Sequence, residues 1–269
     1  MLAFAANSLL CRLALGAGHI DAASFATVRV VSGAVTLGLI LLPRWRQKGI
    51  SGDWRSAGML FAYMVFFSFA YLSLGAGTGA LILFGAVQLT MFIAALRGGE
   101  RFTLLSWVGL GLAILGLVYL ISPGLTAPDL FGAFLMTVAG VAWGFYSLLG
   151  RGAADPLQST AGNFIYCVPL VVVVSLIFVG DFHASATGLM LAVASGGLTS
   201  GLGYAVWYAA LRGLTATRAA TVQLTVPAIA AFGGVALLSE QITLRLVVAS
   251  VATLGGVWIV LAQRPASTT

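Results

Sequence analysis

The sequence has little charge. Only 7% of its 269 residues are Asp, Glu, Lys or Arg, whereas a soluble domain carries about 25%. Hydrophobic residues make up 60% of the chain, so it could not cover itself with a polar surface. The composition therefore excludes a soluble globular protein. It indicates an all-α polytopic membrane protein, because the apolar runs reach the roughly 20 residues that a membrane-spanning helix requires.

Carboxylates, histidines and cysteines are also scarce, and this limits the chemistry. None of the seven acidic residues falls in the middle of an apolar run. Proton-driven antiporters usually keep a buried carboxylate there, so facilitated diffusion or exchange is favoured over proton coupling. The two cysteines, Cys11 and Cys167, have no metal-ligand spacing and fit simple packing roles. We therefore predict no metal, no cofactor and no catalytic residue.

Ten apolar segments are long enough to be membrane spans. They cover residues 2–17, 22–42, 56–74, 78–96, 103–121, 130–150, 158–179, 185–211, 214–238 and 242–262. Linkers with turn residues, such as Pro43, separate them, and their shortness predicts antiparallel neighbours without a soluble domain. Eleven residues precede Arg12, whereas about 20 apolar residues precede its repeat counterpart Arg151. We expect either a short first helix or a start upstream of Met1.

The chain is a tandem duplication. Residues 87–90 recur as residues 222–225, with 135 positions between Gln88 and Gln223. Glu100 likewise recurs as Glu240 after 140 positions, which is close to half of the chain. The predicted units are a first repeat at 1–124 with spans 1–5, a second repeat at 125–264 with spans 6–10, and a short tail at 265–269.

Basic residues predict the orientation of the spans. Ten of the 13 Lys and Arg residues fall on one side of the membrane if the N-terminus is inside. The positive-inside rule then places both termini in the cytoplasm. Five spans per repeat is an odd number, so the second copy enters the membrane the opposite way up. We therefore expect two inverted five-helix repeats whose half-sites meet near the midplane, as in transporters that work by alternating access.

Several short motifs then follow one another in a recognisable order. They are Trp207-Tyr208-Ala209-Ala210-Leu211, Ala219-Ala220, Pro227, Ser239-Glu240-Gln241-Ile242-Thr243 and Gly255-Gly256, with Arg29, Tyr71, Gly99-Glu100, Thr103 and Gly116 in the first half. In this the chain resembles the EamA type of the drug/metabolite transporter superfamily, and within it the YddG-like bacterial amino-acid exporters. The resemblance covers nearly the whole chain and implies a metabolite transporter in the bacterial inner (plasma) membrane. Phe92 stands where the second repeat has Pro227, which argues against a strictly symmetric site.

Two glutamines are candidates for substrate binding. Gln88 and Gln223 each lie about ten residues into a span, roughly 15 Å along the helix and close to the midplane. An amide there offers both a donor and an acceptor to a zwitterionic solute. The alternative is an interhelical hydrogen bond that only holds the bundle together. Duplication of the pair favours the binding role.

Aromatic residues form a second group of candidates. Trp143 and Tyr146 share a helix face, as do Tyr204, Trp207 and Tyr208. Such clusters can line a cavity that receives apolar or cationic groups. An interfacial belt or ordinary packing is the alternative.

Single polar residues complete the set. Arg29, about seven residues into span 2, is suited to a substrate carboxylate, although it could instead snorkel outward. Asn7 and Tyr71 are further substrate-binding candidates. Glu100 and Glu240 each begin a helix with a Thr three residues on, so we interpret them as structural residues that stabilise their own helices, with a gate as the alternative.

These features predict a secondary transporter that exports neutral or zwitterionic solutes such as amino acids. Phosphorylated substrates should require two or more buried Lys or Arg, and Arg29 is the single one expected inside. A nucleoside, sugar or drug transporter of the same fold is the alternative, and a membrane enzyme or receptor is disfavoured. The expected partners are a small-molecule substrate and the lipid bilayer, without nucleic acid, and the protein is expected to be a monomer or a homodimer.

Overall fold

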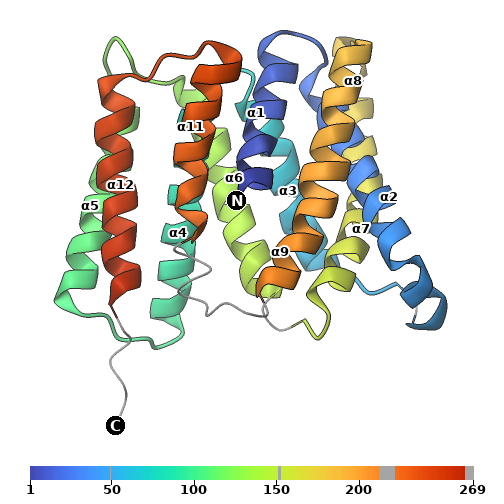
Figure 1. The fold of residues 1–269 in the computed structure, drawn as a ribbon, viewed down its shortest axis with the longest axis horizontal. Coiled ribbons are helices and arrows are strands. Elements are labelled where there is room, and N and C mark those ends of the chain that lie inside the picture. Colours follow the sequence, from blue (N-terminus) through green and yellow to red (C-terminus); the bar gives the residue numbers. More distant parts are fainter. Residues whose placement is uncertain (49, 151–152, 212–221, 264–269) are drawn as a thin grey trace.

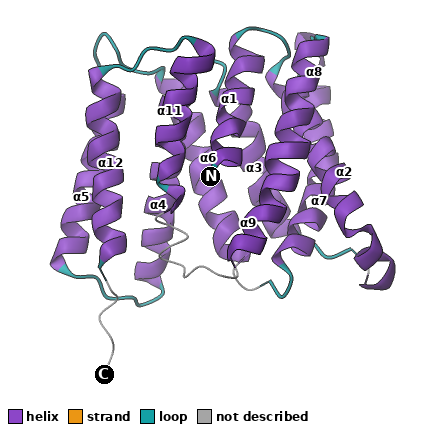
Figure 2. Ribbon diagram, viewed as in Figure 1, coloured by secondary structure: helices purple, strands orange, loops and turns teal. Residues whose placement is uncertain are grey.

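The computed structural model describes residues 1–48, 50–150, 153–211 and 222–263, without the side chains of 44–48, 208, 209 and 211. In this part the chain forms a bundle of helices joined by loops at its two ends (Figures 1 and 2). The β-structure within it is limited to a single bridge between Ile20 and Ala184. The predicted all-α class is confirmed.

The helices follow the predicted segments closely. They are α1 (Leu2–Gly16), α2 (Ala22–Lys48), α3 (Trp54–Ala70), α4 (Ala76–Arg97), α5 (Leu104–Ile121), α6 (Leu130–Gly150), α7 (Pro156–Ile177), the short η1 (Val179–Asp181), α8 (Ala186–Val193), η2 (Ala194–Leu202), α9 (Gly203–Leu211), α11 (Thr225–Leu238) and α12 (Leu244–Ala262). The predicted eighth span is one rod made of α8, the π-helical η2 and α9. The linker expected at Pro43 is wrong, because α2 continues through that residue to Lys48.

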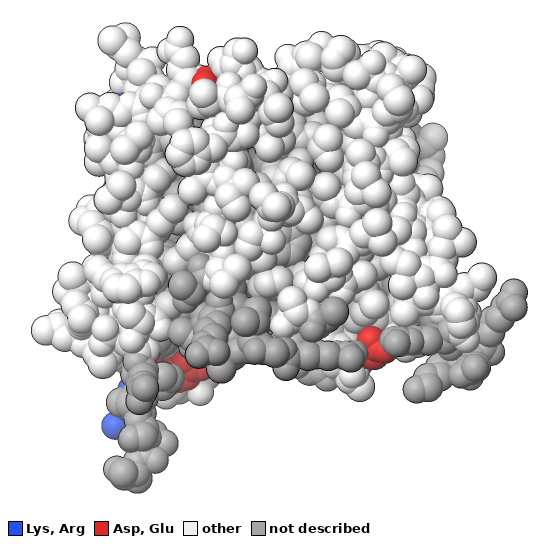
Figure 3. Space-filling view, in the orientation of Figure 1, with Lys and Arg blue, Asp and Glu red and all other residues white. Residues whose placement is uncertain are grey.

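Seven of these segments are long and apolar enough to cross a membrane: α2, α4, α5, α6, α7, the α8–η2–α9 rod and α12. Two further apolar helices, α1 and α11, are shorter, at 15 and 14 residues. The start of the predicted ninth span, residues 214–221, lies outside the described residues. On the face in Figure 3, the visible charged side chains lie near the two ends of the bundle and the band between them is uncharged. This pattern is the one expected of a protein surrounded by lipid.

Helix starts are set by side chains that satisfy free backbone N–H groups. Asp53, Thr103, Asp155, Ser185 and Thr243 each accept a hydrogen bond from the backbone N–H three residues further on. These are the residue types that cap helices best, since each supplies an acceptor to a group with no partner inside the helix.

Close helix pairs join the two halves of the sequence. The most extensive contacts are between α5 and α12, α3 and α6, α4 and α6, and α2 and α7. Small residues permit this approach: a Cβ on Gly109 would lie 2.6 Å from the carbonyl oxygen of Gly256 on the facing helix. Membrane helices commonly pack in this way. Every one of these pairs takes one helix from each half, so the halves share one core.

Candidate functional site

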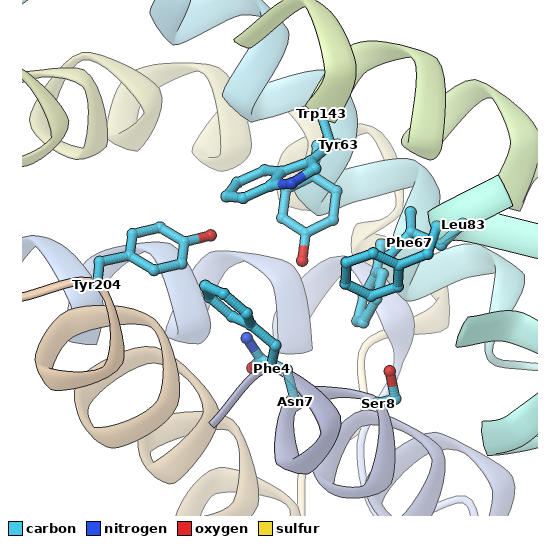
Figure 4. Close-up of a pocket in the computed structure, with 9 residues that line it drawn as sticks. Phe4, Asn7, Ser8, Tyr63, Phe67, Leu83, Trp143 and Tyr204 are labelled. Carbon is cyan, nitrogen blue, oxygen red and sulfur yellow. The ribbon is translucent and has the colours of Figure 1, made fainter. Parts of the chain in front are cut away.

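A small pocket lies within the bundle. Its walls come from five helices, α1, α3, α4, α6 and α9, and are formed by Phe4, Asn7, Ser8, Tyr63, Phe67, Leu83, Phe84, Trp143 and Tyr204 (Figure 4). Its volume is about 10 Å³, which is room for about one water molecule. A solute can therefore enter only if the walls move apart.

Aromatic rings fill most of the pocket. The ring of Phe4 meets Tyr204 edge-on at 5.8 Å between centroids, and Tyr63 lies 4.8 Å from Trp143. Such edge and tilted contacts are favourable for aromatic pairs. In Figure 4 the hydroxyls of Tyr63 and Tyr204 point into the space between the rings. The pocket thus combines apolar surfaces with hydroxyl groups from opposite sides.

Arg29 of α2 stands directly behind this wall and is fully buried. Its Nη2 donates to the Tyr63 hydroxyl at 3.1 Å, and its Nε makes a longer contact of 3.4 Å with Ser200 Oγ. The guanidinium carbon lies 4.8 Å from the ring centroid of Phe67, a cation–π distance. Nη1 has no hydrogen-bond partner in the described part of the chain. The groups described around this cation are therefore neutral.

The π-helical segment η2 supplies the polar side of the site. In a π-helix the hydrogen bonds run from i to i+5, so residues four and five apart share a face. Ser195, Thr199 and Ser200 accordingly converge on Asn7, with oxygen–amide distances of 2.6, 2.6 and 3.3 Å. Turning the Asn7 amide places its oxygen 3.0 Å from Nη2 of Arg29 and its nitrogen toward Ser195 and Thr199. We adopt that orientation, because it leaves no donor facing a donor.

Several predicted residues are brought together here. Asn7, Trp143 and Tyr204 line the pocket. Tyr146 lies behind Trp143, at 5.4 Å between ring centroids, and its hydroxyl donates to Thr160 at 3.1 Å. Trp207 meets Phe4 at 5.9 Å. Their contact with a substrate remains a prediction, but the cluster that the sequence indicated exists.

Other candidates lie elsewhere. Gln88 and Gln223 are partly exposed and neither lines the pocket. Tyr71 is fully buried beyond the end of α3, where its hydroxyl donates to the carbonyl of Ala76 at 3.3 Å. The side chain of Tyr208 lies outside the described residues. Substrate contact by these residues also remains a prediction.

The sequence interpretation missed four aromatic members of the wall: Phe4, Tyr63, Phe67 and Phe84. A signal for two of them was present, because Tyr63, Phe67 and Tyr71 follow one another at four-residue spacing on a single helix face. Phe4 offered no comparable signal, since it lies in the short α1 without an aromatic neighbour on the same face.

A second polar cluster lies at one end of the bundle, where Arg12 and Glu240 line a pocket of about 230 Å³. Arg12 of α1 pairs with Glu240 at 3.4 Å and donates to the carbonyls of Tyr71 and Leu72. Both carboxylate oxygens of Glu240 accept from the backbone N–H of Ala76, at 3.0 and 2.9 Å. The interpretation that Glu240 stabilises its own helix is therefore wrong. It caps the start of α4 instead, while Thr243 caps α12.

Comparison with known proteins agrees with this architecture. The sequence model of the EamA-like transporter family matches residues 130–262 of this chain. An uncharacterized Pseudomonas aeruginosa protein is 51% identical, over 98% of this chain and 92% of its own. The chain belongs to the EamA-like transporter family. It is thus a multi-pass membrane protein with a transport function.

Other similar proteins are more distant. The threonine/homoserine exporter RhtA of Salmonella typhimurium is 34% identical over 139 residues, which is 49% of this chain and 46% of RhtA. A crystal structure of another protein superposes with a TM-score of 0.68 over 97% of this chain and 96% of that one, at 19% identity. At that identity the match concerns the fold alone.

Proposed function

We propose that this EamA-like protein exports neutral or zwitterionic solutes, amino acids first among them, across the bacterial inner membrane. The observation that carries this proposal is the pocket, whose aromatic and neutral polar walls come from both halves of the chain. Apolar rings suit the side chain of a small solute, and hydroxyl and amide groups suit its charged ends. The partial likeness to a threonine/homoserine exporter supports the same class.

The proposed mechanism is alternating access between two inverted five-helix repeats, residues 1–124 and 125–264. Ten spans with both termini cytoplasmic fit the helix order and the positive-inside rule. Each repeat contributes wall residues, so rocking one repeat against the other would open the pocket to either side in turn. We propose a transporter rather than an enzyme, acting as a monomer or homodimer.

We propose that the protein works by facilitated diffusion or exchange and not by proton coupling. Among the described pocket residues there is no carboxylate to carry a proton. A nucleoside, sugar or drug substrate is the second candidate, since aromatic walls would also stack on flat rings.

Flux in proteoliposomes tests both points. Purified protein is reconstituted in vesicles loaded with labelled L-threonine, L-leucine, a nucleoside or a sugar, with and without a pH gradient. We expect amino-acid efflux that does not need the gradient. Movement of the nucleoside or sugar alone would replace the amino-acid proposal, and a strict need for the gradient would replace the energetics.

A further inference from the structure

We propose that Arg29 is the anchor for the carboxylate of the transported solute, and that the solute is an α-amino acid held by both of its charged ends. This inference rests on the proposed export function and specifies how the site selects its substrate. It starts from the charge balance of the bundle interior. Arg29 is fully buried, yet none of the acidic side chains that the structure describes forms an ion pair with it.

A buried cation without a counter-ion is costly unless a partner is supplied. Around Arg29 the described partners are the Tyr63 hydroxyl, the Ser200 hydroxyl, the Asn7 amide and the ring of Phe67. They engage Nε and Nη2 and leave the two N–H groups of Nη1 without an acceptor in the described part of the chain. A carboxylate would supply both the missing acceptor and the missing negative charge.

The partners of Arg29 link this side chain, with its unpaired Nη1, to the pocket. Three of its partners, Asn7, Tyr63 and Phe67, are themselves pocket walls. When those walls separate to admit a solute, Arg29 is the first charged group behind them. A guanidinium presents N–H groups in a planar fork that matches a carboxylate.

The rest of the pocket lining suits an ammonium group. The rings of Phe4, Trp143 and Tyr204 surround the space (Figure 4), and aromatic faces attract cations. The hydroxyl of Ser8 and that of Tyr204 can accept hydrogen bonds from it. A cation behind the lining and neutral, cation-attracting groups around the space together suit the two charged ends of an α-amino acid.

The π-helix keeps the anchor in place. A Cβ on Gly196 of η2 would collide with the backbone carbonyl of Arg29, so α2 and η2 touch through this glycine. The extra width of the π-helix turns Ser195, Thr199 and Ser200 together toward Asn7, which in turn accepts from Arg29. The side chain of Arg29 is thus oriented by neutral groups that do not compete for its remaining charge.

The test compares ligands that differ only at the carboxylate. Binding of L-threonine, L-homoserine, L-leucine and L-phenylalanine to the detergent-purified full chain is measured by calorimetry, next to binding of their amides. Loss of a charge-assisted contact should weaken the amides by about 10- to 100-fold. This comparison uses the unaltered protein, so it does not depend on whether a variant folds.

Variants then locate the contact. Arg29→Gln should lower the affinity for the acids to that for the amides, and Arg29→Lys should restore part of the preference. Arg245→Gln is the matched control, because Arg245, like Arg29, lies over an aromatic ring, but it donates to backbone carbonyls and does not line the pocket. It should leave both affinities unchanged.

The outcomes separate the two proposals. Equal affinity for acids and amides would overturn the anchor while leaving amino-acid export intact. A preference for acids that persists in a folded Arg29→Gln variant would also overturn it. Binding of nucleosides or sugars with no binding of amino acids or amides would overturn the export proposal, and the anchor with it.

Discussion

The two copies of the duplicated glutamate have different surroundings in the folded protein. Glu240 is held by Arg12 and by the backbone N–H of Ala76. Glu100, its repeat counterpart, is exposed, and no hydrogen bond to its carboxylate is formed by the residues that the structure describes. The same sequence motif thus fastens one end of the bundle and leaves its copy at the other end in solvent.

This difference shows that a repeat in sequence need not repeat an interaction. Under the alternating-access proposal, the two ends of the bundle take turns in being closed. The counterpart of Arg12, Arg151, lies outside the described residues, so the comparison is best tested through the two glutamates.

Removing each glutamate in turn should give the largest difference in stability between the two ends. We expect Glu240→Ala to lower the free energy of unfolding by about 2–3 kcal/mol, because it leaves Arg12 and the Ala76 N–H without their charged partner. Glu100→Ala, the matched control, should change it by less than about 0.5 kcal/mol. Denaturant titration in mixed micelles measures both. Equal losses would mean that the two ends are equivalent.

A double-mutant cycle should isolate the ion pair itself. Arg12→Gln and Glu240→Gln are expected to couple by about 1 kcal/mol, because their side chains are in direct contact and partly shielded from water. Arg12→Gln and Glu100→Gln should be additive within about 0.5 kcal/mol. The same unfolding titration applies, and additivity in the first cycle would remove the ion pair as a source of the difference between the ends.

Two helical glycines offer a steric test of the same end. A Cβ on Gly234 would lie 2.6 Å from Oε2 of Glu240, whereas one on Gly255 would meet nothing within 4 Å. Gly255→Ala should stabilise the protein by up to about 1 kcal/mol, because Ala has a higher helix propensity than Gly. We expect Gly234→Ala to lose that gain by displacing the carboxylate, and to recover it in a Glu240→Ala background. Thermal unfolding of the parent, the three single variants and the Gly234→Ala/Glu240→Ala double variant measures this, and a stabilising Gly234→Ala in the parent would contradict the account.

Lowering the pH should produce the smallest change in stability. Both ends of the bundle should contribute to that change. Hydrogen bonds from the backbone and side chain of Ser56 lower the pKa of Asp53, and one from the backbone of Gly132 followed by one from Ser73 lowers the pKa of Asp129. A lowered folded-state pKa contributes stability above the unfolded value, which is lost as pH falls through about 4 and below.

The two aspartates lie at opposite ends, so their caps provide the comparison. Asp53→Asn should lower the free energy of unfolding by less than about 1 kcal/mol at neutral pH. It should also make stability depend less on pH below about pH 4. Asp129→Asn should reduce the pH dependence in the same direction. Melting temperatures between pH 3 and pH 7 measure this, and an acid response confined to one end would show that capping also differs between the ends.

The sequence alone was sufficient for much of the architecture. Apolar runs indicate helices that need no polar surface, and turn residues indicate their ends. Within the described residues the predicted ends lie within about two residues of the helix ends, except at the ends of α2 and α3. Helical spacing also identified Trp143 and Tyr204 as candidates, because residues three or four apart share a face whatever surrounds them. Asn7 was a candidate because a polar side chain inside a span is costly.

The sequence could not show which helix faces contact one another. Ala76 and Glu240 are separated by 164 positions, and no local pattern tells that a carboxylate in one loop will cap a helix in the other half. The π-helical turn of η2 and the missing partner of Arg29 are likewise properties of packing. Composition and periodicity determined a helical membrane protein. Only the tertiary structure decided where its charges are paired, because long-range contacts depend on the packing of all the helices together.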